Sequence, residues 1–152
     1  MLNTGDRAPA FSAPDQDGTV RTLADYRGRR LVLYFYPKDM TEGCTAEACS
    51  FRDNLNRIAG HGAEVLGISP DSVARHRKFI TKESLNFPLL SDPDHAIAEA
   101  YGVWAEKSMY GRTYMGVERT TFIIDEKGRI ATIFRKVKVK GHVDEVLNAL
   151  AD

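Results

Sequence analysis

The chain has 152 residues, a length that suits one domain, residues 1–152, with a sizeable hydrophobic core. Hydrophobic residues make up 43% of the chain and charged residues 28%, which is the balance of an ordinary globular protein. Lysine plus arginine total 21 and aspartate plus glutamate total 21, so the net charge is zero. This balance gives no support to a nucleic-acid-binding or membrane-surface protein, and we expect neither partner.

The amino-terminal stretch bears on where the protein works. Residues 1–6 contain no basic segment followed by an apolar run, and the chain has no run of about 18 apolar residues. We therefore expect no signal peptide, no membrane span and a cytoplasmic location. Because thiols stay reduced in that compartment, the two cysteines are better candidates for redox chemistry or metal binding than for a structural disulfide.

The first half of the chain predicts a hairpin, a buried strand and a long helix. Asp17-Gly18 is typical of a turn between two short strands, which predicts an amino-terminal β-hairpin. Residues 31–36 form a continuous apolar run, LVLYFY, typical of a central strand covered on both faces, and Pro37 ends it. A helix is predicted over residues 41–59, before two glycines that act as stop signals.

The second half continues the alternation of strands and helices. In chain order we predict a strand at 64–69, a helix at 72–82, a helix from Pro93 to Gly102, strands at 121–124 and 129–134, and a helix at 143–150. Alternating elements of this kind indicate an α/β sandwich. Right-handed crossovers would place the 31–36 strand in the centre of its sheet. The alternating lysines of residues 136–140 predict a further strand or edge with a solvated face.

The only two cysteines, Cys44 and Cys49, fall at the start of the predicted 41–59 helix. Thr41 is a good helix N-cap residue, which would put Cys44 at the third helical position. Free amides and the positive end of the helix dipole lie there, and both favour thiolate over thiol. The thiolate is the nucleophile, and Gly43 beside it would let backbone approach a small substrate closely.

The spacing of the cysteines separates them on an intact helix. Cys44 heads an apolar stripe at helical spacing, whereas Cys49 lies among polar residues; the stripe comprises Cys44, Ala48, Phe51, Leu55 and Ile58. Residues five apart on a helix have Cα atoms about 8–9 Å apart and side chains about 140° apart. A disulfide needs roughly 4.4–6.8 Å between Cα atoms. If the two cysteines pair, at least one turn of helix must unwind first.

Purely structural roles for these residues are also possible. Cysteine is often an inert core residue, and Thr41 is explained by capping alone. A metal site is not expected, because the four histidines are scattered along the chain, at His61, His76, His95 and His142.

The stretch YFYPKDMTEGCT carries a family resemblance. Its Pro37, Thr41 and Cys44 match the Pro-x-x-x-Thr-x-x-Cys pattern of the peroxiredoxins. The spacing to Cys49 and the following FRD resemble the bacterioferritin comigratory protein, or peroxiredoxin Q, subfamily. The resemblance covers essentially the whole chain, including segments 5–11, 65–69, 89–92, 101–104 and 119–125.

The resemblance implies a thioredoxin-like sandwich, with a central mixed β-sheet flanked by helices, and a thiol peroxidase activity. By position, Cys44 resembles the peroxidatic cysteine, which hydrogen peroxide or an organic hydroperoxide would oxidise to a sulfenic acid. Cys49 resembles the resolving cysteine, which would close an intramolecular disulfide. Thioredoxin or a glutaredoxin would reduce that disulfide, and no metal, haem or flavin is implied as a cofactor.

The same resemblance assigns the rest of the site. Thr41, Arg119 and the amides near Gly43 would hold the peroxide, and Pro37 would shield it from water. The chain lacks the distant second cysteine and the Gly-Gly-Leu-Gly and Tyr-Phe motifs of dimeric two-cysteine peroxiredoxins. We therefore expect a monomer, intramolecular resolution and less ready overoxidation.

Three other functions remain compatible with the residues. One is a general thiol–disulfide oxidoreductase on the same fold, although the chain lacks a Cys-x-x-Cys motif and a proline before the 121–124 strand. Another is a redox-switched holdase, in which a disulfide changes only helix structure and partner binding. The last is a stable domain with inert cysteines.

Overall fold

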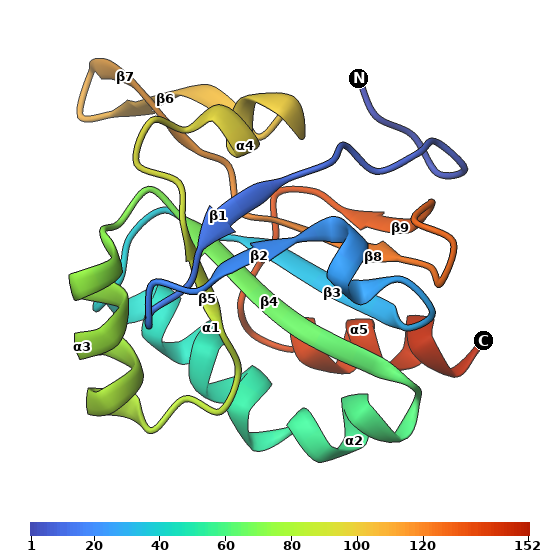
Figure 1. The fold of residues 1–152 in the computed structure, drawn as a ribbon. Coiled ribbons are helices and arrows are strands. Elements are labelled where there is room, and N and C mark those ends of the chain that lie inside the picture. Colours follow the sequence, from blue (N-terminus) through green and yellow to red (C-terminus); the bar gives the residue numbers. More distant parts are fainter.

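A five-stranded mixed sheet forms the centre of the structure, a computed structural model that describes residues 1–152 (Figure 1). Its strands are β3 (Arg30–Phe35), β4 (Ala63–Ser69), β5 (Leu89–Ser91), β8 (Thr120–Ile124) and β9 (Ile130–Phe134). They lie in the order β5-β4-β3-β8-β9. β3 pairs in parallel with β4 and antiparallel with β8, so the continuous apolar run is the central strand, as predicted.

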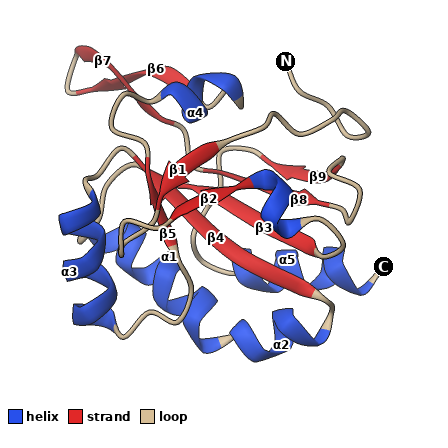
Figure 2. Cartoon of the chain, viewed as in Figure 1, coloured by secondary structure: helices blue, strands red, loops and turns tan.

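Helices cover one face of this sheet, and a thinner mixed layer covers the other (Figures 1 and 2). The helical face carries α1 (Glu42–Asp53), α2 (Leu55–Gly60), α3 (Val73–Glu83) and α5 (His142–Ala151). The opposite face carries β1 (Ser12–Pro14), β2 (Val20–Thr22), the 3-10 helix η1 (Leu23–Tyr26) and α4 (Ala96–Ala100). None of the helices reaches the length and apolarity that crossing a bilayer requires.

The alternation of side chains along β3 builds a separate core on each face. Val32 and Tyr34 point to the helical face, where they join a buried cluster with residues of α1, α2, α3 and α5. Leu33 and Phe35 point the other way, into a cluster under α4 and the amino-terminal hairpin. That hairpin, β1 with β2, forms as the Asp17-Gly18 turn predicted.

The predicted 41–59 helix is wrong in one respect, because it breaks at Asn54 into α1 and α2. The side-chain amide of Asn54 donates a hydrogen bond to the Ser50 carbonyl at 2.8 Å. That carbonyl would otherwise accept the helical bond from the Asn54 backbone, which instead bonds to the Phe51 carbonyl. The side chain thus competes with the helix for its own backbone partner.

The helix predicted to open at Pro93 is also wrong in its start, because α4 begins at Ala96. The Asp92 carboxylate accepts hydrogen bonds from the amides of Ile97 at 3.1 Å and Ala98 at 2.9 Å. It caps the helix from outside, while His95 turns the chain with a left-handed φ of 51°. Pro93 therefore lies in the turn that precedes the helix.

A second hairpin, β6 (Trp104–Met109) with β7 (Arg112–Val117), was not predicted. It projects from the body of the fold (Figure 1). Most of its residues are exposed, so no apolar alternation marks it in the sequence. Tyr110-Gly111 forms its turn with φ values of 51° and 77°. The lysine-rich residues 136–140 form a loop and not the predicted strand or edge.

Gly67 of β4 offers a direct test of the close packing at the sheet centre. A Cβ there would lie 2.7 Å from a Leu89 methyl carbon and 2.9 Å from the Tyr34 ring. We expect Gly67→Ala to lower the free energy of unfolding by about 1–3 kcal/mol in urea denaturation, because neither buried side chain can move away. Gly60→Ala is the control, since nothing lies within 4 Å of its Cβ. Equal effects of the two substitutions would contradict this packing.

Candidate active site

The strand–loop–helix junction that follows β3 carries most of the residues singled out in the sequence. β3 ends at Phe35, the chain turns through Pro37, and α1 begins at Glu42 with Thr41 in the N-cap position. Cys44 lies in the first turn of α1 and is only 1% exposed. Its side chain joins the core cluster on the helical face, as the apolar stripe predicted.

Thr41 occupies the predicted N-cap position but does not cap the helix with its side chain. Its hydroxyl donates a hydrogen bond to the Lys38 carbonyl at 2.8 Å. No side chain accepts from the amides of the first turn of α1, so the capping prediction is wrong for the hydroxyl. The start of α1 therefore keeps its positive dipole end and its amides open to a ligand.

Arg119 contacts Cys44 although the two residues lie 75 positions apart in the chain. The register of the sheet pairs Phe35 with Thr120, so Arg119 falls beside the point where the chain leaves β3. One guanidinium nitrogen, Nη2, donates to Cys44 Sγ at 3.4 Å. The same nitrogen would lie 3.3 Å from a Cβ on Gly43, so the glycine leaves room for the guanidinium against the helix start.

Glu47 completes this group and was missed in the sequence. It lies one turn after Cys44 on α1, the i,i+3 spacing that places two side chains on one face. Its Oε1 accepts from Arg119 Nη1 at 2.6 Å, and its Oε2 is buried without a partner. Loss of hydration raises the pKa of this carboxyl to about 7, although Arg119 acts to lower it.

Cys49 lies away from Cys44, as the helical spacing predicted. It is partly exposed, and its Sγ donates to the Glu83 carboxylate of α3 at 3.7 Å. Burial raises the pKa of this thiol, with Arg52 acting to lower it and Glu83 to raise it. Both cysteines are free thiols in this conformation.

A cleft opens beside the junction. Its volume is about 570 Å³, and its walls are Pro37, Lys38 and Thr41 on one side and Met109, Tyr114 and Met115 of the β6–β7 hairpin on the other. Cys44, Gly43 and Arg119 are not part of this lining. The structure thus brings all the predicted site residues except Cys49 to one corner of the fold.

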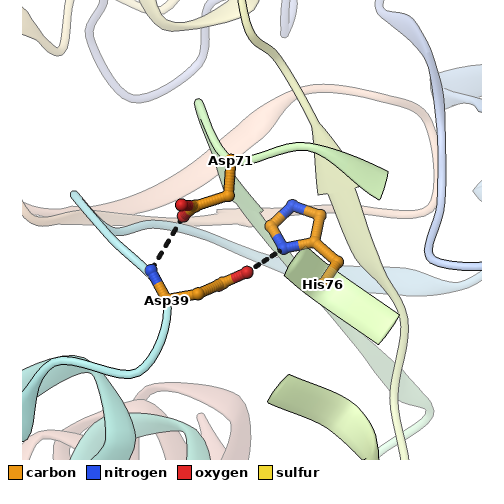
Figure 3. Close-up of side chains that lie close together, drawn as sticks. All are labelled: Asp39, Asp71 and His76. Atoms are coloured by element: carbon orange, nitrogen blue, oxygen red, sulfur yellow. Dashed lines mark hydrogen bonds and ion pairs between the residues drawn. The ribbon is translucent and has the colours of Figure 1, made fainter. Parts of the chain in front are cut away.

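A second cluster was not predicted (Figure 3). It consists of Asp39, which lies in the loop between β3 and α1, together with Asp71 and His76. Their possible ligand atoms lie within 4.8 Å of one another. Each of these atoms already has a hydrogen-bond partner from the chain itself. The cluster is therefore built as a hydrogen-bond network, and a metal ion would have to displace those partners.

Comparison with known proteins agrees with this geometry. The model of the AhpC/TSA family matches residues 4–133. The chain belongs to this family. It is 50% identical to Peroxiredoxin Bcp of Escherichia coli over 151 residues, covering 99% of this chain and 97% of the relative. Peroxiredoxin Bcp of Bacillus subtilis is 49% identical over 151 residues, covering 99% of this chain and 96% of the relative.

Solved structures place the chain among the same peroxiredoxins. The bacterioferritin comigratory protein of Xanthomonas campestris superposes with a TM-score of 0.91 at 42% identity, over 98% of both chains. Peroxidoxin BcpB of Mycobacterium tuberculosis gives a TM-score of 0.88 at 37% identity, over 99% of this chain and 97% of that one. The resemblance noted in the sequence and the expected thioredoxin-like fold are both confirmed, and this peroxiredoxin is a peroxidase of the Bcp/peroxiredoxin Q type.

The buried Glu47 carboxyl of this peroxiredoxin predicts a pH-dependent stability. Because its pKa in the folded state is raised to about 7, folding retains a proton that the unfolded chain releases near pH 4.5. The free energy of unfolding should therefore fall as the pH rises toward 7, by at most about 3 kcal/mol from this group. Urea denaturation at pH 5 and pH 8 should show this fall in the wild type and a smaller one in Glu47→Gln. Identical pH profiles would contradict it.

Proposed function

We propose that this peroxiredoxin reduces hydrogen peroxide and organic hydroperoxides through Cys44, with Cys49 as the resolving residue. The observation that carries the proposal is the Arg119 hydrogen bond to Cys44 Sγ in the first turn of α1. It places a permanent cation against the sulfur, at a helix start whose amides no side chain occupies. Both features stabilise a thiolate, and they also stabilise the negative charge that develops on the departing oxygen of the peroxide.

The chemical step is a displacement on oxygen. The Cys44 thiolate attacks the near oxygen of the peroxide, the O–O bond breaks, and Cys44 becomes a sulfenic acid. Negative charge moves from sulfur to the departing oxygen, which leaves as water or alcohol after taking up a proton. Arg119 and the first-turn amides near Gly43 are already positioned to stabilise the negative charge on both oxygens, so they need not rearrange during the reaction. Thr41 holds the peroxide beside them. Pro37, partly buried at the turn, limits the access of water.

Resolution requires the helix start to unwind, because the two thiols point in different directions from α1. The Cys49 sulfur then attacks the Cys44 sulfur, a disulfide forms, and water leaves with the sulfenic oxygen. A dithiol protein, thioredoxin or a glutaredoxin, takes the disulfide and returns both cysteines to thiols. We propose a monomer, since this cycle needs no second subunit, and a cytoplasmic location, where thiols are kept reduced.

The apolar wall of the cleft supports the organic hydroperoxides in this proposal. Met109, Tyr114 and Met115 line the cleft although they are between 44% and 55% exposed, and an alkyl tail would cover them. The Xanthomonas campestris relative has been studied for its alkyl peroxide reduction activity.

The cysteine roles are tested with one equivalent of hydrogen peroxide. The reduced wild type should lose both thiols and two hydrogens by intact mass, because the disulfide forms. Cys49→Ser should stop at a sulfenic acid or an intermolecular disulfide, and Cys44→Ser should keep its thiol. If Cys44→Ser reacted as fast as the wild type, the assignment of Cys44 would be overturned. If no variant reacted within minutes, the peroxidase proposal would fail.

The cleft is tested by comparing two tyrosines of the hairpin. Tyr114→Ala should raise the KM for cumene hydroperoxide about 3–10-fold, because it removes apolar contact area, and leave the KM for hydrogen peroxide unchanged. Tyr110→Ala is the matched control, since Tyr110 is 97% exposed at the hairpin turn and lies outside the cleft lining. A rise of KM for both peroxides, or the same rise in Tyr110→Ala, would argue against an alkyl site here.

A further inference from the structure

The proposed peroxidase chemistry leaves the cluster of Asp39, Asp71 and His76 unused, although hydrogen bonds satisfy all of its possible ligand atoms. Asp39 lies at its centre, two residues before Thr41 (Figure 3). Its side chain accepts a hydrogen bond from the Tyr36 hydroxyl on Oδ1 and faces His76 Nδ1 on Oδ2 at 2.6 Å. All three side chains are at most 1% exposed.

The partners of His76 decide how this pair is held. Its Nε2 faces the Leu90 carbonyl at 2.8 Å, and a carbonyl only accepts, so Nε2 carries a proton. Its Nδ1 lies 2.6 Å from a carboxylate oxygen of Asp39, which is a hydrogen-bond distance. Asp39 and His76 are therefore joined by a hydrogen bond between two fully buried side chains.

The backbone of Asp39 is held as firmly as its side chain. Its amide donates to Asp71 Oδ2 at 2.8 Å, and that oxygen also accepts from the Ser69 hydroxyl at 2.6 Å. Arg75 donates to Asp71 Oδ1 at 3.1 Å and to the Asp39 carbonyl at 3.3 Å. These partners belong to β4, α3 and the turn between them, which lie outside the cysteine-bearing helix α1.

The residues directly after Asp39 are strained or exposed, whereas Asp39 itself is held by several hydrogen bonds. Met40 is held in the left-handed region, with a φ of 62°, which is strained for a residue with a side chain. Thr41 and Glu42 are exposed, and the Thr41 hydroxyl leaves the helix uncapped. The start of α1 thus has few contacts, whereas the neighbouring Asp39 is held by several hydrogen bonds.

We propose that the Asp39–His76 pair is the fixed hinge of the redox cycle, at which the unwinding of α1 stops. The inference rests on the proposed Cys44–Cys49 disulfide. When the cysteines pair, residues from Met40 to Cys49 rearrange and the strain at Met40 is released. Asp39 and the loop before it keep their places. Asp39 and His76 are positioning residues, because they return Thr41 and Cys44 to Arg119 after each reduction and touch no substrate.

Hydrogen exchange followed by NMR tests the hinge in the wild type. The disulfide is formed with diamide, so the test does not depend on peroxidase activity. Amides of residues 45–48, held only by α1 itself, should exchange at least about 100-fold faster in the disulfide form. The Asp39 amide, held by Asp71, should change less than about threefold. The ring ¹⁵N shifts of His76 should be the same in both redox states.

Two results overturn the hinge. One is an Asp39 amide that loses protection together with residues 45–48, or a change in the ring ¹⁵N shifts of His76 on oxidation. The other is a disulfide that forms without any loss of protection in α1. A protein that forms the disulfide with diamide but does not react with hydrogen peroxide would contradict the proposed function and leave the hinge decided by the exchange data.

A pair of histidine variants tests the role of His76 itself. In the disulfide form of His76→Gln, the region of fast exchange should extend back to Asp39, and after reduction the rate with hydrogen peroxide should be about tenfold lower. His61→Gln is the matched control, because His61 is exposed at the end of α2 and should behave like the wild type. A protected Asp39 amide in oxidised His76→Gln would overturn the role of this side chain. If that variant fails to fold, the wild-type exchange data still decide.

Discussion

The site depends on one partly buried interaction, in which the Arg119 guanidinium lies between the Glu47 carboxyl and the Cys44 sulfur. It joins the start of α1 to the start of β8, residues 75 positions apart in the chain. Arg119 is placed by the register of β8 on β3, and Glu47 holds its other nitrogen. The Cys44 sulfur, the proposed nucleophile, therefore lies against a cation that is already positioned before any peroxide binds.

In the proposed cycle, α1 has to be ordered when the peroxide reacts and has to unwind when the two cysteines form a disulfide. Packing of the apolar side of α1 on β3 orders the first turn for the peroxide step. No side chain caps that turn, and the missing cap lowers its stability. A network below Asp39 limits how far the disorder can spread.

Much of this account is readable from the sequence, because local patterns carry it. The run at 31–36 marks the central strand, and helical spacing alone separates Cys44 from Cys49. Glu47 was missed although its spacing from Cys44 points to it, since only the fold brings Arg119 there. Asp39 and His76 are 37 positions apart, and no local pattern connects them. The β6–β7 hairpin was not predicted, because its exposed strands show no apolar alternation in the sequence.

The central claim is that Arg119 activates Cys44, and the rate of thiol loss from reduced protein mixed with hydrogen peroxide tests it most directly. Arg119→Lys keeps the charge but has one nitrogen in place of the two that bind Glu47 and Cys44 separately, so the second-order rate constant should fall about 100-fold or more. Arg112→Lys, on the exposed hairpin, is the control and should match the wild type. An Arg119→Lys protein that reacts within about threefold of the wild type would contradict the account.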